Sequence, residues 1–216
     1  MPIINFSHYK GGVGKSTLTA SVAVALKMNG LSVSILDLDG LQSSIYFNKL
    51  RIKNGHEPIE CSSAETVDEI KATCEKFRDS EKILLIDSGG YDSDISRYSM
   101  LASDILITPV APSMVELNGL QKYAKILKQI SEKYEQPFKT NVVINNADIR
   151  SKGMITELRQ YIQKHNTYLD LFETVIYSRA DYKKAYGAGI GVTELDNSKA
   201  SIDIQQFVIE IQKELE

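Results

Sequence analysis

The stretch Lys10-Gly11-Gly12-Val13-Gly14-Lys15-Ser16-Thr17 decides the fold of this chain. It lies between a short β-prone segment, 2–8, and a helical pattern, 16–29, which is the strand-to-helix setting of a phosphate-binding loop. The glycines let backbone N–H groups converge on an anion, and the start of the helix adds positive potential. Lys15 is placed to neutralise the β- and γ-phosphates of a nucleotide, and the Ser16 hydroxyl to bind Mg²⁺. The motif therefore predicts a nucleotide site that uses Mg²⁺.

Short apolar segments alternate with helical patterns along the rest of the chain. The further strands are expected at 31–37, 82–87, 104–110, 140–145 and 174–177. The further helices are expected at 64–80, 115–134, 152–164, 180–186 and 201–215. Uninterrupted apolar strands between helices predict an α/β fold, with a mostly parallel sheet covered by helices on both faces. Residues 40–63 show no clear pattern, and 88–94 are expected to form a loop.

The composition is that of an ordinary globular protein. The 216 residues are 43% hydrophobic and 25% charged, which excludes disorder of the whole chain and favours one domain over residues 1–216. The two cysteines, Cys61 and Cys74, fit neither a disulfide framework nor a zinc pattern. No signal peptide and no apolar window of about 20 residues is present, so we expect a cytoplasmic protein without a membrane span.

Polar residues follow several of the expected strands. In a parallel sheet the ligand binds at the carboxyl ends of the strands, where the glycine-rich loop also lies. The residues expected at this edge are Asp37, Asp39, Asp87 and Asn145. A carboxylate at such a position has a second interpretation, because it can cap a helix or a turn. Asn145 can likewise be a turn residue.

The glycine-rich loop departs from the common G-x-x-x-x-G-K-[ST] pattern. Tyr9 stands where the first glycine would be, and Lys10 directly precedes the double glycine. K-G-G-x-G-K-[ST] is the deviant Walker A motif, and the chain resembles the ParA/MinD family of ATPases. Residues 37–39, 83–90, 104–116 and 179–194 are also similar to segments of that family. The resemblance covers most of the chain and implies a P-loop NTPase of the SIMIBI type.

The resemblance also implies roles for these residues. It implies an ATP-dependent sandwich homodimer in which Lys10 reaches the phosphates held by the other subunit. It assigns the attacking water to Asp39, the Mg²⁺ shell to Asp37 and Asp87, and the adenine edge to Asn145. The predicted catalytic residues are then Lys10, Lys15 and Asp39, the predicted nucleotide-binding residues 10–17 with Asn145, and the predicted metal ligands Ser16, Asp37 and Asp87.

Two departures from the family pattern qualify these roles. The family often has D-P-Q-x-S after the second strand, whereas this chain has Asp39-Gly40-Leu41-Gln42-Ser43. Any role of that glutamine is therefore in doubt, and a nucleotide-binding scaffold that does not hydrolyse ATP stays open. Glu116 stands where many members have aspartate, which keeps the acid and changes its reach.

Charge distribution bears on the branch of the family. The chain carries a net charge of −3, yet residues 150–184 hold seven basic and four acidic residues. This excess fits contact with a phosphate backbone, and an ordinary solvated face is the alternative. The candidate DNA contacts are Arg150, Lys152, Arg179, Lys183 and Lys184. The last expected helix is net acidic, so we expect it to pack on the core rather than on a membrane.

We therefore expect a partition ATPase of the ParA type. Its ATP-bound dimer would bind non-specific DNA at the nucleoid and hydrolyse ATP slowly. A centromere-binding ParB-like partner would stimulate this hydrolysis. No cysteine cluster supports the iron–sulfur members of the superfamily. Only nine residues precede Lys10, so no operator-reading module is expected. The alternative is a MinD-type positioning switch that localises a protein machine through partner contacts rather than DNA.

Overall fold

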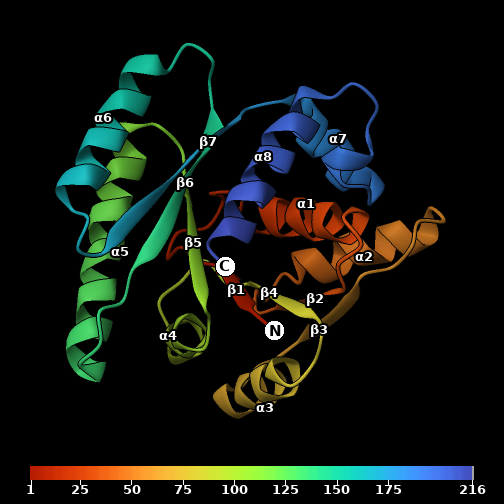
Figure 1. Cartoon of the computed structure of the whole chain (residues 1–216), viewed down its shortest axis with the longest axis horizontal. Helices are drawn as coiled ribbons and strands as arrows, with labels where there is room; N and C mark the ends of the chain where they lie inside the picture. The colour runs from red at the N-terminus through yellow and green to blue at the C-terminus, as the bar shows by residue number, and fades with distance from the viewer. Residues whose placement is uncertain (216) are drawn as a thin grey trace.

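A parallel β-sheet forms the centre of the molecule (Figure 1). The computed structural model describes residues 1–215, so Glu216, the last residue of the expected domain, lies outside the described residues. The strands are β1 (Ile3–Phe6), β2 (Val33–Asp37), β3 (Glu60–Ser63), β4 (Ile83–Asp87), β5 (Ile105–Val110), β6 (Thr140–Ala147) and β7 (Leu169–Tyr177). They pair in the order β3-β2-β4-β1-β5-β6-β7, and every pair is parallel. The predicted α/β class is confirmed.

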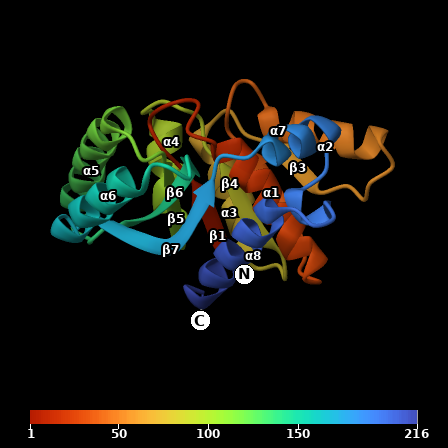
Figure 2. The same cartoon turned by 90° about the horizontal axis from the view of Figure 1, so that it is seen from above.

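Helices cover both faces of this sheet (Figures 1 and 2). They are α1 (Lys15–Met28), α2 (Ser43–Lys53), α3 (Val67–Arg78), α4 (Asp94–Leu101), α5 (Met114–Tyr134), α6 (Lys152–Lys164), α7 (Ala180–Ala188) and α8 (Lys199–Lys213), with a 3-10 turn, η1 (Val192–Glu194). One core joins α1, α2, α7 and α8 to one face, and two further clusters join α3 to α6 to the other. Every residue of β1, β2, β4 and β5 is buried, which explains their unbroken apolar sequences.

Three elements were not predicted from the sequence. Helix α2 and strand β3 lie in the stretch 40–63, where no pattern was visible, and α4 follows the expected loop. The buried residues of α2 include Ser44 and Arg51, and those of α4 include Ser96 and Ser99. Strand β3 is an edge strand with mostly exposed residues. Because polar residues occupy these inward positions, the apolar periodicity that identifies an element is missing.

Helix α8 packs on the core and contacts β7. Its buried side chains include Ile204, Phe207 and Ile211, so the expected packing of the last helix is confirmed. Glu210 accepts the backbone N–H groups of Glu173 (2.7 Å) and Thr174 (2.9 Å), where β7 bulges out of register with β6. These amides would otherwise lack a ladder partner. Strand β7 is longer than expected because it includes this bulge. Over residues 1–215 no helix has the length and apolarity needed to cross a bilayer.

Candidate functional site

The glycine-rich loop joins β1 to α1 at the carboxyl edge of the sheet. Gly12 and Gly14 have positive φ angles of 78° and 97°, which side-chain-bearing residues adopt at a cost. Gly14 is also crowded, since a Cβ atom there would lie 2.5 Å from Nδ2 of Asn145. Asn145 donates this Nδ2 to the carbonyl oxygen of Val13 at 2.8 Å. The loop therefore has the curled backbone that an anion site requires, and Asn145 braces it.

Lys15 lies beneath this loop. Its side chain is buried, and Nζ donates to the carbonyl oxygen of Lys10 at 3.2 Å. Burial lowers the pKa of Lys15, while the charges of Asp87 and Asp39 oppose that change. Within residues 1–215 no carboxylate forms an ion pair with Lys15. A buried ammonium without a direct counter-ion is suited to bind phosphate oxygens.

Lys10 points toward α5 in this structure. Its ammonium forms a close ion pair with the carboxylate of Glu116, in the first turn of that helix. The Glu116 side chain is only 15% exposed, whereas that of Lys10 is 37% exposed. The lysine that the sequence predicts to act across a dimer is therefore held within its own subunit here.

Asp37 makes only backbone contacts among the described residues. Its Oδ2 accepts the N–H groups of Ser44 (2.8 Å) and Ile45 (3.1 Å), and its Oδ1 accepts the N–H of Asp39 (3.1 Å). Burial raises the pKa of Asp37, and these hydrogen bonds oppose the rise. This is the geometry of a carboxylate that caps α2. The interpretation of Asp37 as a cap is therefore favoured over that of a metal ligand.

Asp87 is fully buried at the end of β4. Its Oδ2 accepts the hydroxyl of Ser44 at 2.7 Å, while its Oδ1 has no hydrogen-bond partner within residues 1–215. Burial raises the pKa of Asp87 to about 7, and the Ser44 hydroxyl and the Lys15 charge act in the opposite direction. An unpartnered buried carboxylate oxygen is costly unless a cation or a bound water completes it.

The residues present fit a magnesium ion. Ser16 stands in the first turn of α1, directly after the loop, and Asp87 ends β4, the strand paired with β1, so both can face one ion. No cluster of three or more His, Cys, Asp or Glu side chains exists in the described chain. Mg²⁺ does not need one, because it is commonly bound by one or two protein groups together with phosphates and water. Ser16 and Asp87 are therefore the residues that would hold it.

Asp39 and Asn145 lie at the carboxyl edge of the sheet, near the ends of β2 and β6. Asp39 is half-buried, and its Oδ1 accepts the N–H of Leu41 at 3.1 Å. A hollow of about 420 Å³ opens beside the loop, between α1, the end of β6 and α7. Its lining includes Gly12, Thr17, Asn145, Tyr182, Lys183 and Tyr186. An apolar and aromatic hollow beside a phosphate loop suits a nucleotide base. The roles of Asp39 and Asn145 stay predictions.

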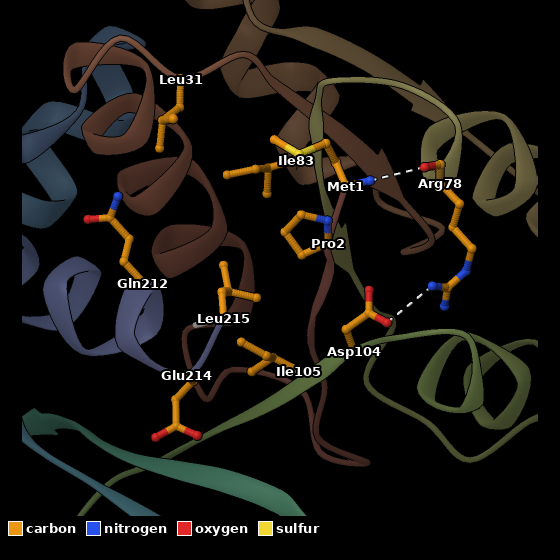
Figure 3. Close-up of a pocket in the computed structure, with 10 residues that line it drawn as sticks. All are labelled: Met1, Pro2, Leu31, Arg78, Ile83, Asp104, Ile105, Gln212, Glu214 and Leu215. Carbon is orange, nitrogen blue, oxygen red and sulfur yellow. Dashed lines mark hydrogen bonds and ion pairs between the residues drawn. The ribbon is translucent and has the colours of Figure 1, made fainter.

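A larger hollow of about 620 Å³ lies elsewhere (Figure 3). Its lining includes Pro2, Ile83 and Ile105, which stand at the amino ends of β1, β4 and β5. The ion pair between Arg78 and Asp104 (3.1 Å) stands at its side. It contains none of the residues predicted for nucleotide binding, so its size does not mark the site.

The five candidate DNA contacts differ in their exposure and in whether they form an ion pair within the chain. The Arg179 side chain is bound to Asp203 at 2.9 Å, where both side chains are largely buried. Arg150 is exposed and pairs with Asp148 at 2.9 Å. Lys152, Lys183 and Lys184 are exposed and have no ion pair within residues 1–215. Arg179 therefore leaves the set that we propose, because contact with phosphate would break a buried pair.

Three residues that were not predicted from the sequence also lie at the site. Ser44 contacts both Asp37 and Asp87, and it lies in the stretch where no element was visible. Tyr186 donates its hydroxyl to the carbonyl oxygen of Ser43 at 2.8 Å, which links the base hollow to α2. His8 is fully buried and its Nδ1 accepts the N–H of Lys10 at 3.0 Å. Only His8 had a signal, since it lies two residues before the loop.

One family model matches most of the chain. The family model described as the CobQ/CobB/MinD/ParA nucleotide binding domain matches residues 4–192. No curated protein matches the sequence.

Solved structures are similar over nearly their whole length. An ATP complex of a McdA variant from Cyanothece has a TM-score of 0.72 at 17% identity, covering 100% of this chain and 96% of that one. The septum site-determining protein MinD with Mg-ADP from Pyrococcus horikoshii has a TM-score of 0.73 at 16% identity, covering 98% and 96%. A putative plasmid partition protein from Borrelia burgdorferi, bound to AMPPNP, has a TM-score of 0.68 at 16% identity, covering 98% and 99%.

Proposed function

We propose that this chain, which belongs to the CobQ/CobB/MinD/ParA nucleotide-binding domain family, is an ATPase whose ATP-bound homodimer binds non-specific DNA. The resemblance to the ParA/MinD ATPases is the premise. The observation that carries the proposal is the loop at residues 10–17, with Lys15 buried beneath it and Lys10 at its entrance. ATP and Mg²⁺ are the proposed ligands, since similar structures hold ATP and Mg-ADP. Residues 1–216 form one ATPase domain in this proposal.

The residues act on the phosphates in distinct ways. The loop amides and Lys15 bind the β- and γ-phosphates, and Ser16 and Asp87 hold Mg²⁺. When bound, the ion offsets the negative charge that develops on the phosphate oxygens. Asp39 accepts a hydrogen bond from the attacking water and orients it. Lys10 of the second subunit adds positive charge at the γ-phosphate, so hydrolysis is slow in a single subunit and faster in the dimer.

Exposed apolar side chains support a dimer face around the site. Leu41, Tyr91, Met114 and Val115 follow β2, β4 and β5, so they project from the same edge of the sheet as the loop. Leu41 is 83% exposed and Val115 67% exposed. Large apolar side chains gathered around a charged site are typical of an interface that forms with a ligand. A second copy of the chain is the occupant that this proposal requires.

Free lysines support contact with DNA. Lys183 and Lys184 lie on α7, and Lys152 opens α6. Both helices follow strands that end at the nucleotide edge, so a dimer would present two such sets on one assembly. Contacts of this type are made to the phosphate backbone and carry no sequence preference. A centromere-binding ParB-like partner that stimulates hydrolysis completes the proposed cycle, and binding to non-specific DNA would place the protein at the nucleoid.

A second candidate function has support in the comparisons. One of the similar structures is a septum site-determining protein, so a positioning switch that acts through protein contacts is the alternative. In that case the dimer forms with ATP, but DNA is not its binding surface. DNA affinity in the ATP state separates the two functions.

The test is binding to long non-specific DNA at about 100 mM salt, because such binding depends steeply on ionic strength. The wild-type protein is compared with ATP and Mg²⁺, with ADP and Mg²⁺, and with Lys15→Ala. We expect binding only in the wild type with ATP, and weaker binding in Lys183→Ala/Lys184→Ala. ATP turnover without DNA binding in any state would contradict the DNA role and favour the positioning switch. Nucleotide binding without turnover would favour the scaffold.

A further inference from the structure

Two buried polar atoms near Lys10 have no hydrogen-bond partner among residues 1–215. One is Nε2 of His8 and the other is Oε2 of Glu116. His8 lies two residues before Lys10, and Glu116 is the ion-pair partner of Lys10. Unpartnered buried polar atoms are rare and each requires an explanation. Two such atoms lie beside Lys10, the residue that is proposed to move, and the inference rests on them.

The protonation of His8 makes the two atoms complementary. Its Nδ1 accepts the N–H of Lys10, so a neutral ring carries its proton on Nε2. Burial and the charges of Lys15 and Lys10 lower the pKa of His8 to about 3, which keeps the ring neutral. Nε2 is therefore a hydrogen-bond donor without an acceptor. Oε2 of Glu116 is a carboxylate oxygen, an acceptor without a donor.

The His8 ring lies against the side of α5 that carries Glu116. The His8 ring stacks on Tyr9 and Tyr123 at centroid distances of 5.0 and 5.4 Å. Its edge faces Gly119, since a Cβ atom at Gly119 would lie 3.9 Å from Nε2. Glu116 is three positions before Gly119, so both lie on the same side of the helix. Because glycine carries no side chain, nothing from position 119 separates the ring from the preceding turn.

We propose that His8 donates a hydrogen bond from Nε2 to the Glu116 carboxylate once Lys10 leaves it, so that His8 is a positioning residue for the closed dimer. This inference rests on the proposed function, in which Lys10 moves to the second subunit. Without a replacement, the departure of Lys10 would strand a largely buried carboxylate, which is strongly unfavourable. With the hydrogen bond from His8, Glu116 exchanges the charged ammonium of Lys10 for a neutral donor. His8 then holds both the Lys10 backbone and the former partner of the Lys10 side chain.

The direct test is the ¹⁵N and ¹H NMR spectrum of the histidine rings in the nucleotide-free protein. The chain has three histidines, and His56 and His165 serve as internal controls. In Lys10→Ala the carboxylate of Glu116 is released without nucleotide or dimer. We expect the His8 Nε2 proton to shift downfield from its wild-type position and to exchange more slowly with water. The shift should be absent in Lys10→Ala/Glu116→Ala. An unchanged His8 signal in Lys10→Ala overturns the inference.

A second arm connects the contact to the proposed function. The wild-type spectrum is recorded with Mg-ATP, and the molar mass is measured by light scattering on the same sample. A dimer with the same downfield shift is the expected result. A dimer without the shift overturns the exchange and leaves the dimeric switch intact. The shift in Lys10→Ala, together with no ATP-dependent dimer of the wild type, contradicts the proposed function and leaves the His8–Glu116 contact standing.

Two substitutions of His8 separate its two nitrogen atoms. His8→Asn keeps an acceptor near the position of Nδ1 and removes the donor, whereas His8→Gln keeps a donor near the position of Nε2 and removes the acceptor. We expect dimerisation at saturating ATP to weaken by about tenfold in His8→Asn, the usual effect of one hydrogen bond to a charged group. His8→Gln should dimerise like the wild type at saturating ATP. Equal losses in both variants would mean a purely structural role and overturn the proposal.

Discussion

The Ser44 hydroxyl donates a 2.7 Å hydrogen bond to Asp87, although 43 residues separate them. The backbone N–H of the same serine donates to Asp37 at 2.8 Å. Ser44 thus joins the first turn of α2 to the ends of β2 and β4, and both carboxylates depend on where that turn lies. Tyr186 fixes the same turn from the side of the base hollow, through the carbonyl oxygen of Ser43. The phosphate end and the base end of the site therefore share one helical turn.

Ser44→Ala tests this shared turn. The substitution leaves both oxygens of Asp87 without a partner among the described residues, so we expect unfolding to become easier by about 1–3 kcal/mol. ATP turnover should fall and require more Mg²⁺. Urea denaturation and turnover over a range of Mg²⁺ concentrations are the measurements. The matched control is Ser43→Ala. The Ser43 side chain makes no hydrogen bond within residues 1–215, so this variant should behave as wild type. Equal behaviour of the two variants would contradict the role of Ser44.

Asp87→Asn should change the pH dependence of stability in the nucleotide- and metal-free protein. Because burial raises the pKa of Asp87 to about 7, the folded chain keeps a proton that the unfolded chain releases near pH 4. The wild type therefore loses stability as pH rises from about 4 to about 7, by at most about 4 kcal/mol from this group. Asparagine cannot ionise, so the variant lacks this loss. Urea denaturation at pH 5 and pH 8 in EDTA measures the difference, and parallel profiles would contradict the prediction.

Val115→Asp tests the apolar face around the site. A carboxylate at this exposed position, next to Glu116, should weaken the ATP-dependent dimer by at least about tenfold, because burying an unpaired charge is unfavourable. ATP binding by the single subunit should remain. Light scattering with Mg-ATP and a fluorescent-nucleotide titration are the measurements. Ile209→Asp is the matched control, since Ile209 is similarly exposed on α8, away from this face. If both variants dimerise normally, the face is not at residue 115.

Glu210→Gln tests how α8 holds the bulge of β7. The carboxylate accepts two backbone N–H groups and the Thr174 hydroxyl, and an amide would present only one oxygen to them. Loss of charge-assisted bonds should lower the free energy of unfolding by about 1–3 kcal/mol. Denaturation in urea measures it. Glu214→Gln, at an exposed carboxylate with no hydrogen bond in the described chain, should have no effect, and the two variants should differ if the bulge depends on Glu210.

The fold was predictable wherever the chain is apolar. The strands that end at Asp37 and Asp87 were predicted from their nearly continuous apolar residues, and the alternation of such strands with helices indicated the α/β class. Prediction failed at α2 and α4, whose inward positions hold serine and arginine. Polar residues can be buried there because they are hydrogen-bonded, as Arg51 is to Glu194 and to the carbonyl oxygen of Gly189. Such partners lie more than 130 residues apart and leave no local pattern.

The sequence predicted which residues lie near the glycine-rich loop better than it predicted their contacts, and the roles of those residues stay predictions. The rule that ligands bind at strand ends brought Lys15, Asp39 and Asp87 to one edge. No spacing in the sequence indicates that Lys10 meets Glu116, because that contact depends on where α5 begins beside the loop. For the same reason the capping of α2 by Asp37 stayed one of two open interpretations until the position of α2 was known.

Strand β1 lies between β4 and β5, and this position has a consequence for synthesis of the chain. The glycine-rich loop leaves the ribosome before β4 and β5, yet β1 pairs with Leu84–Asp87 and with Ile105–Ile107. Until those residues have emerged, the strand that anchors the loop has no neighbours, and the site lacks Asp87. A nascent chain that ends before β5 should therefore be unable to retain nucleotide. Binding competence therefore arises only after β5 is translated, although the motif that binds nucleotide precedes it in the chain.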